Sequence, residues 1–296
     1  MGRYKIAVAA ACHNRRETTL RCLASLFGQT LGDEVELTVF LVDDGSSDGT
    51  SHAVKKAFPD VRILKGDGSL YWNGAMYMAL QEALKEPCDF HLWLNDDVRL
   101  YPDALSNLIS TYESLLSGTG SRAIVVGSFC DPETGIRSYG GLRRCSRFHP
   151  LKFAPVFNGK TPLPCHTFEA NGVLVPAAVF TKIGVIESRF SGFQNAGDTE
   201  YGLRATMAGT PIYTSSGFIG DCAVNSGGRP WEIPGLSFYQ RWNALMGPKG
   251  LQSRVYFLYA RQYGGKFWPL FWLLPMIKSL LTLFFPDGYK LKRFFR

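Results

Sequence analysis

The sequence predicts an α/β protein with a mainly parallel sheet flanked by helices, extended at the C-terminus by a helical appendage that is basic and aromatic. Short apolar segments alternate with helical patterns over residues 5–100, as they do where crossover helices join parallel strands. Each apolar segment ends in polar residues, which is typical of a sheet that binds a ligand at the carboxyl ends of its strands. The chain has 296 residues, 46% of them hydrophobic, and can bury a sizeable core. We divide it into a main domain at 1–230 and an appendage at 231–296.

The expected elements follow from this alternation. Apolar segments predict strands at 6–11, 37–42, 61–64, 90–94, 123–128 and 172–176. Helical spacing of apolar residues predicts helices at 18–27, about 50–58 and 73–85, and a further helix that begins near 102. The segment 140–165 is rich in Gly, Arg and Pro, which predicts a mobile or substrate-specific loop.

Seven cysteines, an odd number, are widely spaced and never form a CxxC pair. This pattern argues against a disulfide framework and against a zinc site, so we expect reduced and mostly buried thiols. The apolar segment at 6–11 is too short for a membrane span and is assigned to the first strand rather than to a signal peptide. Reduced cysteines and the lack of an export signal predict a cytoplasmic protein.

The positive charge of the chain is concentrated near its C-terminus. The whole chain carries +7, whereas residues 241–296 hold ten basic residues against one acid, a net charge of +9. The first 240 residues therefore carry a net charge of −2. A nucleic-acid-binding domain would carry basic residues across its binding face, so we do not expect nucleic acid as a partner.

The segment 266–286 is about as long as a membrane span but is interrupted by Lys278, Pro269 and Pro275. Its tryptophans and flanking basic residues are typical of the interface between lipid headgroups and acyl chains. An anionic membrane surface would attract its charge, so we expect peripheral binding at the inner face of the cell membrane. The alternative is a helix pair that packs on the main domain or in a homo-oligomer.

Two adjacent carboxylates follow the strand at 90–94, in the sequence Asn95-Asp96-Asp97. Adjacent acids repel each other unless a positive group lies close to them, and a divalent cation with oxygen ligands satisfies both. We therefore expect a metal ion that holds a phosphate. The alternative is an Asx turn or an N-cap before the helix near 102.

A second acidic pair, Asp43 and Asp44, ends the second strand and leads into a turn rich in Gly and Ser. Both carboxylates can accept hydrogen bonds from a nucleobase or a ribose, and the turn offers backbone N–H groups. The alternative is a turn that caps the next helix, with Asp48 as its N-cap. Asn14 and Arg15 follow the first strand, and parallel topology brings all three strand ends to one edge of the sheet.

Several segments, taken in order, resemble the inverting glycosyltransferases of family 2, which have the GT-A fold. The similar segments are CHNRRETTLRCLASLFGQT, LVDDGSSDGT, GDGSLYWNGAMYMAL, LWLNDDV, EANGVLVP and GDTEYGLRATMAG. They cover about residues 5–226. Bacterial O-antigen and other surface-polysaccharide transferases, including rhamnosyl- and galactofuranosyltransferases, are similar.

The resemblance implies a nucleotide-sugar donor whose base and ribose contact Asp43 and Asp44, with Asn14 and Arg15 nearby. It also places LWLNDDV at the DxD metal motif of the family.

Asn95 takes the first position of that motif and Asp97 the last. Asp97 is then the principal ligand of Mg²⁺ or Mn²⁺, while Asn95 and Asp96 belong to the donor site. Family members often add a later His ligand, which this sequence lacks, and Asp221 is the predicted substitute.

The same resemblance makes Asp198 the catalytic base, because inverting displacement needs one carboxylate to take the proton of the acceptor hydroxyl. Glu200 either orients the acceptor or pairs with Arg204, four residues further along a helix. The alternative for this segment is a plain helix start, where acids complement the helix dipole.

The residues expected to contact the sugar or the acceptor lie in three of these segments. They are Trp72, Asn73, Asn171, Gly172 and Glu200. Backbone N–H groups at the helix start after Tyr71 would position sugar or phosphate. Core packing explains the aromatic residues equally well.

These features predict an inverting, metal-dependent enzyme that moves a sugar from a UDP- or dTDP-linked donor to a growing, lipid-linked surface glycan. A sugar-nucleotide pyrophosphorylase shares the nucleotide-binding half-sheet, but it would need a Gly-rich N-terminal loop in place of His13-Asn14-Arg15. A processive synthase would need several spanning helices. A non-catalytic membrane scaffold that retains the fold stays open because of Asn95 and the missing His.

Overall fold

A nine-stranded sheet forms the centre of the molecule in a computed structural model that describes residues 4–31, 35–157, 159–190, 196–224, 230–233, 235–247, 249–250 and 253–284. Its strand order is β3-β2-β1-β4-β11-β6-β12-β5, and β9 pairs with β12. The strands are β1 (Tyr4–Cys12), β2 (Val35–Asp44), β3 (Arg62–Gly66), β4 (Phe90–Asn95), β5 (Arg99–Leu100), β6 (Ile124–Cys130), β9 (Pro164–Cys165), β11 (Gly172–Pro176) and β12 (Ile212–Asp221).

The predicted α/β class with a mainly parallel sheet is confirmed. Strands β3, β2, β1 and β4 are parallel to one another, as are β6 and β12. The antiparallel strands are β11, β5 and β9. Each of the six predicted strands overlaps an observed one, because buried strands carry continuous apolar segments that are visible in the sequence.

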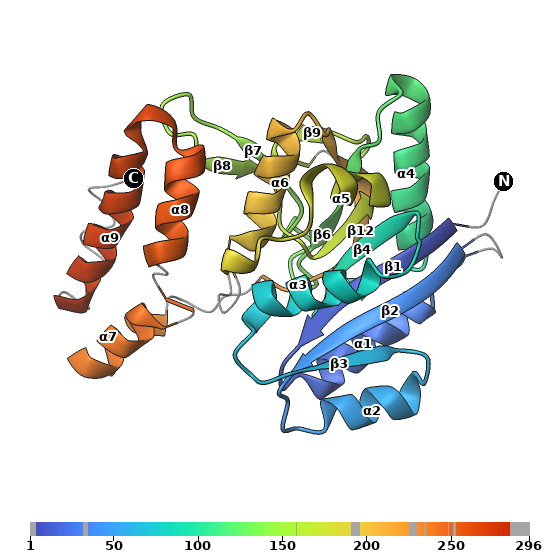
Figure 1. The fold of residues 1–296 in the computed structure, drawn as a ribbon, viewed down its shortest axis with the longest axis horizontal. Coiled ribbons are helices and arrows are strands. Elements are labelled where there is room, and N and C mark those ends of the chain that lie inside the picture. The colour runs from blue at the N-terminus through green and yellow to red at the C-terminus, as the bar shows by residue number, and fades with distance from the viewer. Residues whose placement is uncertain are drawn as a thin grey trace.

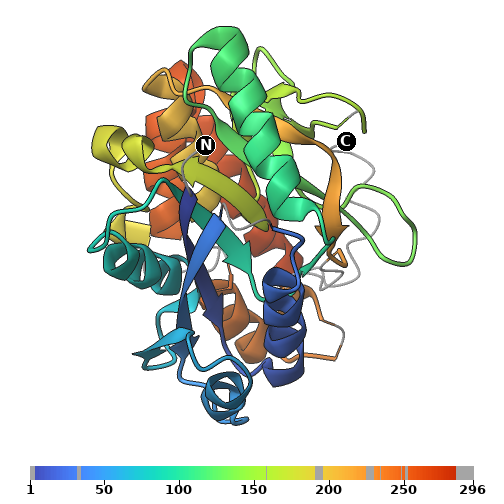
Figure 2. The ribbon, with the colours of Figure 1, turned by 90° about the vertical axis from the view of Figure 1, so that its right-hand side faces the viewer.

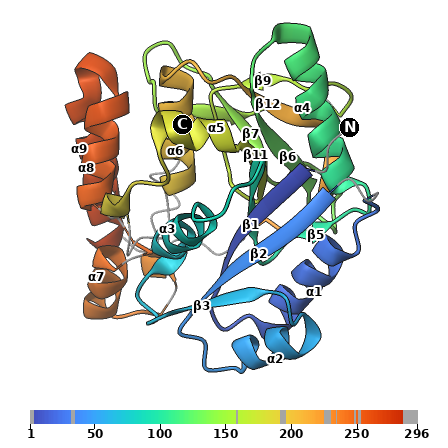
Figure 3. The same cartoon turned by 45° about the vertical axis from the view of Figure 1, so that its right-hand side comes forward.

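Helices cover both faces of this sheet (Figures 1 and 3). One face packs against α1 (Arg16–Phe27), α2 (Thr50–Ala57) and α4 (Ala104–Thr119). The other packs against α3 (Tyr71–Ala83), α5 (Ala177–Ile183) and α6 (Gly197–Met207). Short 3₁₀ turns lie at η1 (Ser188–Phe190), η2 (Pro230–Glu232) and η3 (Gly265–Phe267).

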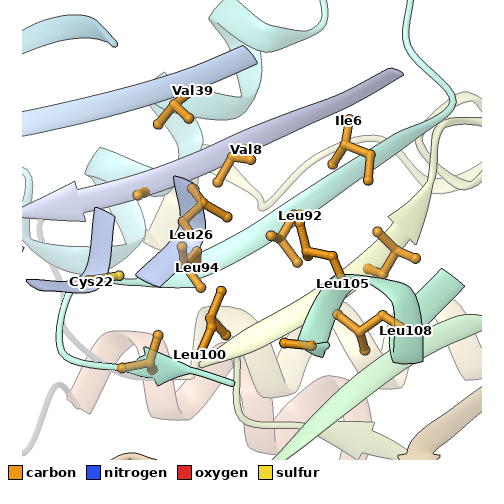
Figure 4. Packing of buried hydrophobic residues seen from close by; sticks show 14 of the residues in the cluster. Ile6, Val8, Cys22, Leu26, Val39, Leu92, Leu94, Leu100, Leu105 and Leu108 are labelled. Atoms are coloured by element: carbon orange, nitrogen blue, oxygen red, sulfur yellow. The ribbon is translucent and has the colours of Figure 1, made fainter. Parts of the chain in front are cut away.

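The two cores follow from the alternation of side chains along the strands. Val8 faces the first layer of helices, whereas Ala9 faces the second. Figure 4 shows Leu26 of α1 and Leu105 of α4 beside Leu92 and Val8. On the other face, Ala7 and Ala9 of β1 share a cluster with Ala75 and Ala79 of α3, and these small side chains let α3 approach β1 closely.

A second, three-stranded sheet lies partly within the segment predicted to be a loop. Its order is β10-β7-β8, with β7 (Gly141–Arg144), β8 (Phe153–Pro155) and β10 (Thr167–Phe168). These strands have four, three and two residues, which is too short to show a period of two in the sequence. The expected loop at 140–165 is therefore partly ordered as sheet.

Three helices make up the described part of the C-terminal segment: α7 (Phe238–Met246), α8 (Ser253–Tyr263) and α9 (Trp268–Phe284). They form a group beside α6 in Figure 1, and in Figure 2 they lie behind the sheet. Leu203 of α6 is buried against Tyr259 and Tyr263 of α8, so the segment packs on the main domain.

No helix within the described ranges is both long enough and apolar enough to cross a membrane. The most apolar of them, α9, has 17 residues and contains Pro275. All seven cysteines are free thiols and five are buried, as predicted.

Candidate active site

The carboxyl ends of β1, β2 and β4 meet at one edge of the sheet, as the parallel topology predicts. Cys12 of β1 pairs with Asp43 of β2, and Ala11 pairs with Asn95 of β4. A pocket of about 500 Å³ opens at this edge. Its lining consists of Ala11, Cys12, His13, Arg15, Asp44, Gly68, Tyr71, Trp72, Ala75, Asn95, Asp96, Asp97, Pro230, Ala244, Gly247 and Lys249.

Asp44 lines the pocket and also fixes the loop that follows β3. Its carboxylate accepts hydrogen bonds from the backbone N–H groups of Gly68 at 2.8 Å and Tyr71 at 2.9 Å. A Cβ at Gly66 would lie 2.5 Å from Asp44 Oδ1, so this close approach needs glycine. The pocket wall at the start of α3 is therefore held by one buried carboxylate.

Asp43 lies outside the pocket lining and holds its own turn. Its carboxylate accepts hydrogen bonds from the backbone N–H of Ser46 at 3.0 Å and from the hydroxyl of Ser51. Asp48 accepts a hydrogen bond from the backbone N–H of Thr50, the first residue of α2, at 3.0 Å. The turn that the sequence allowed as an alternative is thus present around these acids.

Asn14 fastens the end of β1 to that turn. It has a φ of +51°, and its side-chain oxygen accepts a hydrogen bond from the backbone N–H of Ser47 at 2.8 Å. His13 Nδ1 lies 2.6 Å from the backbone oxygen of Asp44. Asn14 therefore supports the site from outside the pocket lining.

Arg15 bridges the two adjacent acids that the sequence singled out. Its Nη1 donates to Asp96 Oδ1 at 3.1 Å and to Asp97 Oδ2 at 2.9 Å. Asp96 is 6% exposed, and this burial raises its pKa to about 6 against the opposing effect of Arg15. The side chain of Asp97 is 23% exposed, so Asp97 is the more accessible of the two carboxylates.

Asn95 holds an aromatic wall of the pocket. The indole Nε1 of Trp72 donates to Asn95 Oδ1 at 2.7 Å. Both residues line the pocket. The amide oxygen at this position therefore orients the half-buried indole without adding a third negative charge beside Asp96 and Asp97.

The oxygen atoms at this edge fit a divalent cation whose remaining coordination positions are filled by a bound ligand. Asp96 and Asp97 supply the carboxylate oxygens, and in this structure Arg15 Nη1 lies between them. No group of three His, Cys, Asp or Glu side chains arranged for a metal occurs in the described parts of the chain. Mg²⁺ typically binds through one or two carboxylates together with substrate phosphates and water, which is the set available here.

Asp221 is placed differently from the prediction that made it a metal ligand. Its carboxylate accepts hydrogen bonds from Arg99 Nε at 2.9 Å and from the Tyr101 hydroxyl at 2.6 Å. The next residue, Cys222, points the other way, and its Sγ lies 3.8 Å from Asp97 Oδ1. Side chains alternate along a strand, so only one of these neighbours can face the acidic pair.

Asp198, the predicted base, lies in the first turn of α6. Its carboxylate accepts hydrogen bonds from the backbone N–H groups of Ala170 at 3.2 Å and Thr199 at 2.7 Å. Burial raises the pKa of Asp198, and these hydrogen bonds oppose the rise. The position also agrees with the alternative of an acid that complements the helix dipole. Asp198 lies outside the pocket lining.

Glu200 and Asn73 are buried rather than exposed to a ligand. Glu200 is fully buried, pairs with Arg204 Nη2 at 3.1 Å and accepts a hydrogen bond from the Tyr263 hydroxyl at 2.6 Å. The ion pair with Arg204 is thus confirmed, whereas contact with an acceptor disagrees with this burial. Asn73 is also fully buried and packs against Gly197, where a Cβ would lie 2.1 Å from its Oδ1.

Asn171 and Gly172, predicted to contact the sugar or the acceptor, belong to the framework of the sheet. Gly172 pairs with Leu94 inside the sheet and is buried. Asn171 is 5% exposed, its backbone oxygen accepts a hydrogen bond from Asn95, and its side chain donates to Cys222 Sγ at 3.3 Å. Both residues support the strand end that carries the acidic pair.

One wall of the pocket has no counterpart in the sequence motifs. It consists of Pro230, Ala244, Gly247 and Lys249, from the segment around α7. A signal was present in the short Gly-Pro-Lys-Gly sequence at 247–250, whose glycines indicate a turn that presents a lysine.

Comparison with known proteins agrees with this architecture. The galactofuranosyltransferase GlfT2 of Mycolicibacterium smegmatis is 31% identical over a match of 112 positions that covers 35% of this chain and 17% of GlfT2. The crystal structure of S. aureus TarS 1-349 in complex with UDP-GlcNAc has a TM-score of 0.54 at 16% identity, over 81% of this chain and 64% of that one. A second TarS structure gives a TM-score of 0.52, also at 16% identity, over 74% of this chain and 37% of that one.

These relatives are longer than the present chain, which spans less than two thirds of each. The TarS structures, at 16% identity, show a shared fold. The family model for Glycosyl transferase family 2 matches residues 7–160, which is slightly more than half of the chain. The matched segment includes all three strand ends. The chain is therefore a member of glycosyl transferase family 2.

Proposed function

We propose that this family 2 glycosyltransferase moves a sugar from a UDP- or dTDP-linked donor to a bacterial surface polysaccharide, with inversion at the anomeric carbon. The observation that carries the proposal is the pocket where Arg15, Asp44, Asp96 and Asp97 meet at the carboxyl edge of the sheet. Relatives support the substrate class, since GlfT2 is a galactofuranosyltransferase and TarS was crystallised with UDP-GlcNAc. Family membership favours transfer over pyrophosphorylase activity.

In the proposed reaction the acceptor hydroxyl attacks the anomeric carbon while the bond to the leaving phosphate oxygen breaks. Asp198 takes the hydroxyl proton, and its raised pKa makes it a better proton acceptor than an ordinary aspartate. Asp44 and Trp72 orient the donor in the pocket. Mg²⁺ or Mn²⁺ held by Asp97 and Asp96 would neutralise charge on the leaving diphosphate.

A lipid-linked acceptor and peripheral membrane binding belong to the same proposal. One side of α9 exposes apolar residues at helical spacing, each at least 42% exposed: Leu270, Leu273, Leu274, Ile277 and Leu281. Lys266 and Lys278 flank this apolar stripe, as expected for a helix in the interface of an anionic membrane. We propose that the stripe holds the enzyme at the inner face of the cell membrane.

A thermal stabilisation screen with UDP-, dTDP- and GDP-sugars, with and without Mn²⁺, tests the donor proposal. A ligand at 100 times its Kd stabilises the folded state by about 2.7 kcal/mol, so we expect a clear rise in Tm for UDP- or dTDP-sugars. Free monosaccharides serve as the control and should leave the Tm unchanged. A failure of every nucleotide sugar to raise the Tm, with or without metal, would contradict a donor site in this pocket.

A further inference from the structure

The donor pocket has two walls of different origin. One is the carboxyl edge of β1, β2 and β4, which carries the residues that the sequence motifs predict. The other is formed by Pro230, Ala244, Gly247 and Lys249, which belong to the segment around α7. The second wall therefore brings a basic side chain to a site whose known motifs lie more than 100 residues earlier in the chain.

Lys249 is presented by a turn that is anchored on α7. The backbone N–H of Gly250 donates to the oxygen of Gly247 at 2.8 Å, and a Cβ at Gly250 would lie 2.1 Å from the backbone oxygen of Leu245. Leu245 itself is fully buried in a cluster with Trp231 and with Leu283 of α9. A turn packed this closely against its helix fixes the backbone from which the lysine extends.

α7 is in turn fixed at its N-terminus. Ser237 and Gln240 form a reciprocal capping box, with Gln240 N donating to Ser237 Oγ at 3.3 Å and Ser237 N donating to Gln240 Oε1 at 2.9 Å. Arg241 is 7% exposed, and its Nε donates to the backbone oxygen of Leu236 at 3.0 Å. The capping box therefore holds the start of α7, and the turn at Gly250 packs against its end.

The charged side chains that line the pocket differ in whether they have hydrogen-bond or ion-pair partners. The carboxylate of Asp44 is held by backbone N–H groups, and Asp96 and Asp97 share Arg15. Lys249 is the other lining cation, and within the described ranges no carboxylate pairs with it. Its exposed ammonium group is therefore available to a ligand, whereas the guanidinium of Arg15 is already engaged twice.

A nucleoside diphosphate that enters this pocket brings negative charge close to Asp96 and Asp97. Repulsion from these carboxylates must be offset by positive charge. Arg15 supplies one positive charge, which Asp96 and Asp97 share. A lysine ammonium carries three donors on a flexible stem and binds phosphate as a point charge. Lys249 meets this need from the opposite wall.

We propose that Lys249 binds the diphosphate of the nucleotide-sugar donor, so that the C-terminal segment completes the donor site. The inference rests on the proposed function, because it assigns a residue to the same pocket. It makes Lys249 a donor-binding residue and leaves proton transfer with Asp198.

Calorimetric titration of the full chain with UDP and dTDP, without lipid present, tests this assignment. We expect the Lys249→Met variant to bind the diphosphates at least tenfold more weakly than the wild type, while its affinity for uridine and thymidine stays the same. Lys249→Arg should keep most of the affinity because it keeps the charge. Lys266→Met, in a residue that does not line the pocket, is the matched control and should bind as the wild type does.

Unchanged diphosphate affinity in Lys249→Met would overturn the inference, and so would an equal loss for the nucleosides, which would indicate a general change of the pocket. If the wild type binds neither diphosphate, the proposed donor site fails and this inference falls with it. Acetylation of the wild type gives a readout that needs no variant. UDP should protect Lys249 but not Lys266 from the reagent, as measured by peptide mass spectrometry, and equal labelling with and without UDP would count against the assignment.

Discussion

Asp198 carries the proton transfer in the proposed reaction, and Asp198→Asn tests that role at nearly constant shape. The amide keeps the shape of the carboxylate and one of its two hydrogen bonds from the backbone N–H groups of Ala170 and Thr199, but it cannot take a proton. We expect the transfer rate to fall by about 10²–10⁴-fold, the usual contribution of a general base, while donor affinity measured by calorimetry is unchanged. Retained turnover in the variant would exclude Asp198 as the base.

The same role predicts a pH dependence of the wild-type enzyme. The base must be deprotonated, and burial raises the pKa of Asp198 above its ordinary value of 3.8. As the pH is lowered, the transfer rate should therefore begin to fall at a pH higher than an ordinary aspartate would give.

Asp97 is the accessible carboxylate of the acidic pair, and its removal should weaken donor binding that depends on metal. We expect Asp97→Ala to lower the affinity for UDP in the presence of Mn²⁺ by at least tenfold, with a smaller change in its absence. Titration of UDP at several Mn²⁺ concentrations measures both values. Asp221→Asn is the control, since Arg99 and Tyr101 hold that carboxylate. An equal response to Mn²⁺ in Asp97→Ala and the wild type would exclude Asp97 as a metal ligand.

Some positions in the site could be predicted from local sequence, whereas others depend on contacts between residues far apart in the chain. Arg15, Asp44, Asn95, Asp96 and Asp97 lie at one edge of the sheet as predicted, because a strand followed by polar residues is a local signal and parallel strands share an edge. The burial of Asn73, Gly172 and Glu200 depends on partners far along the chain: Gly197, Phe129 and Tyr263. No local pattern reveals such a partner.

At the scale of elements, α6 and α8 are joined by a buried hydrogen bond that can be tested by itself. The hydroxyl of Tyr263 donates a hydrogen bond to the buried carboxylate of Glu200. Burial raises the pKa of the Tyr263 hydroxyl, and the hydrogen bond to Glu200 raises it further. We expect Tyr263→Phe to lower the free energy of unfolding by about 1.5–3 kcal/mol, the value of a hydrogen bond to a charged group.

Urea unfolding measures this loss. Tyr256→Phe is the control, since Tyr256 packs in the same cluster and its hydroxyl has no hydrogen bond to any described residue. Equal stability of Tyr263→Phe and the wild type would show that the hydrogen bond does not hold α8 on α6.

The helices α1 to α3 and most of the longer strands were predictable because each has its own period or apolar segment, whereas the ten-residue strand β12 was not predicted. The predicted helices at 18–27, about 50–58 and 73–85 correspond to α1, α2 and α3 within two residues at each end. Strands β7, β8 and β10 escaped prediction because strands of two to four residues are specified by their neighbours.

At the scale of the whole molecule, the apolar stripe on α9 tests the proposed membrane contact. Leu274 is 57% exposed, and burying a leucine in an apolar medium is worth about 1.5–3 kcal/mol. We therefore expect Leu274→Glu to bind phosphatidylserine-containing vesicles at least tenfold more weakly than the wild type in a sedimentation assay. Ile136→Glu, a change at a residue 69% exposed in the loop after β6, is the matched control.

Vesicle binding that survives Leu274→Glu would contradict the membrane contact. A wild-type dimer that becomes monomeric in this variant, as seen by analytical ultracentrifugation, would instead support the homo-oligomer that the sequence allowed. Point substitutions are the sharper tool here. Deleting the chain from residue 266 would also remove Leu283, which is buried against Trp231 and Leu245 beside the pocket wall.

The wall formed by α7 has a consequence for how such enzymes can be recombined. Ala244 of α7 and Lys249 of the following turn line the donor pocket, while Phe238 and Trp242 of α7 are 51% and 41% exposed. A chimera that exchanges the C-terminal segment would also exchange one wall of the donor pocket. Because Lys249 moves with the exchanged segment, such a chimera would also change how the diphosphate of the donor is bound.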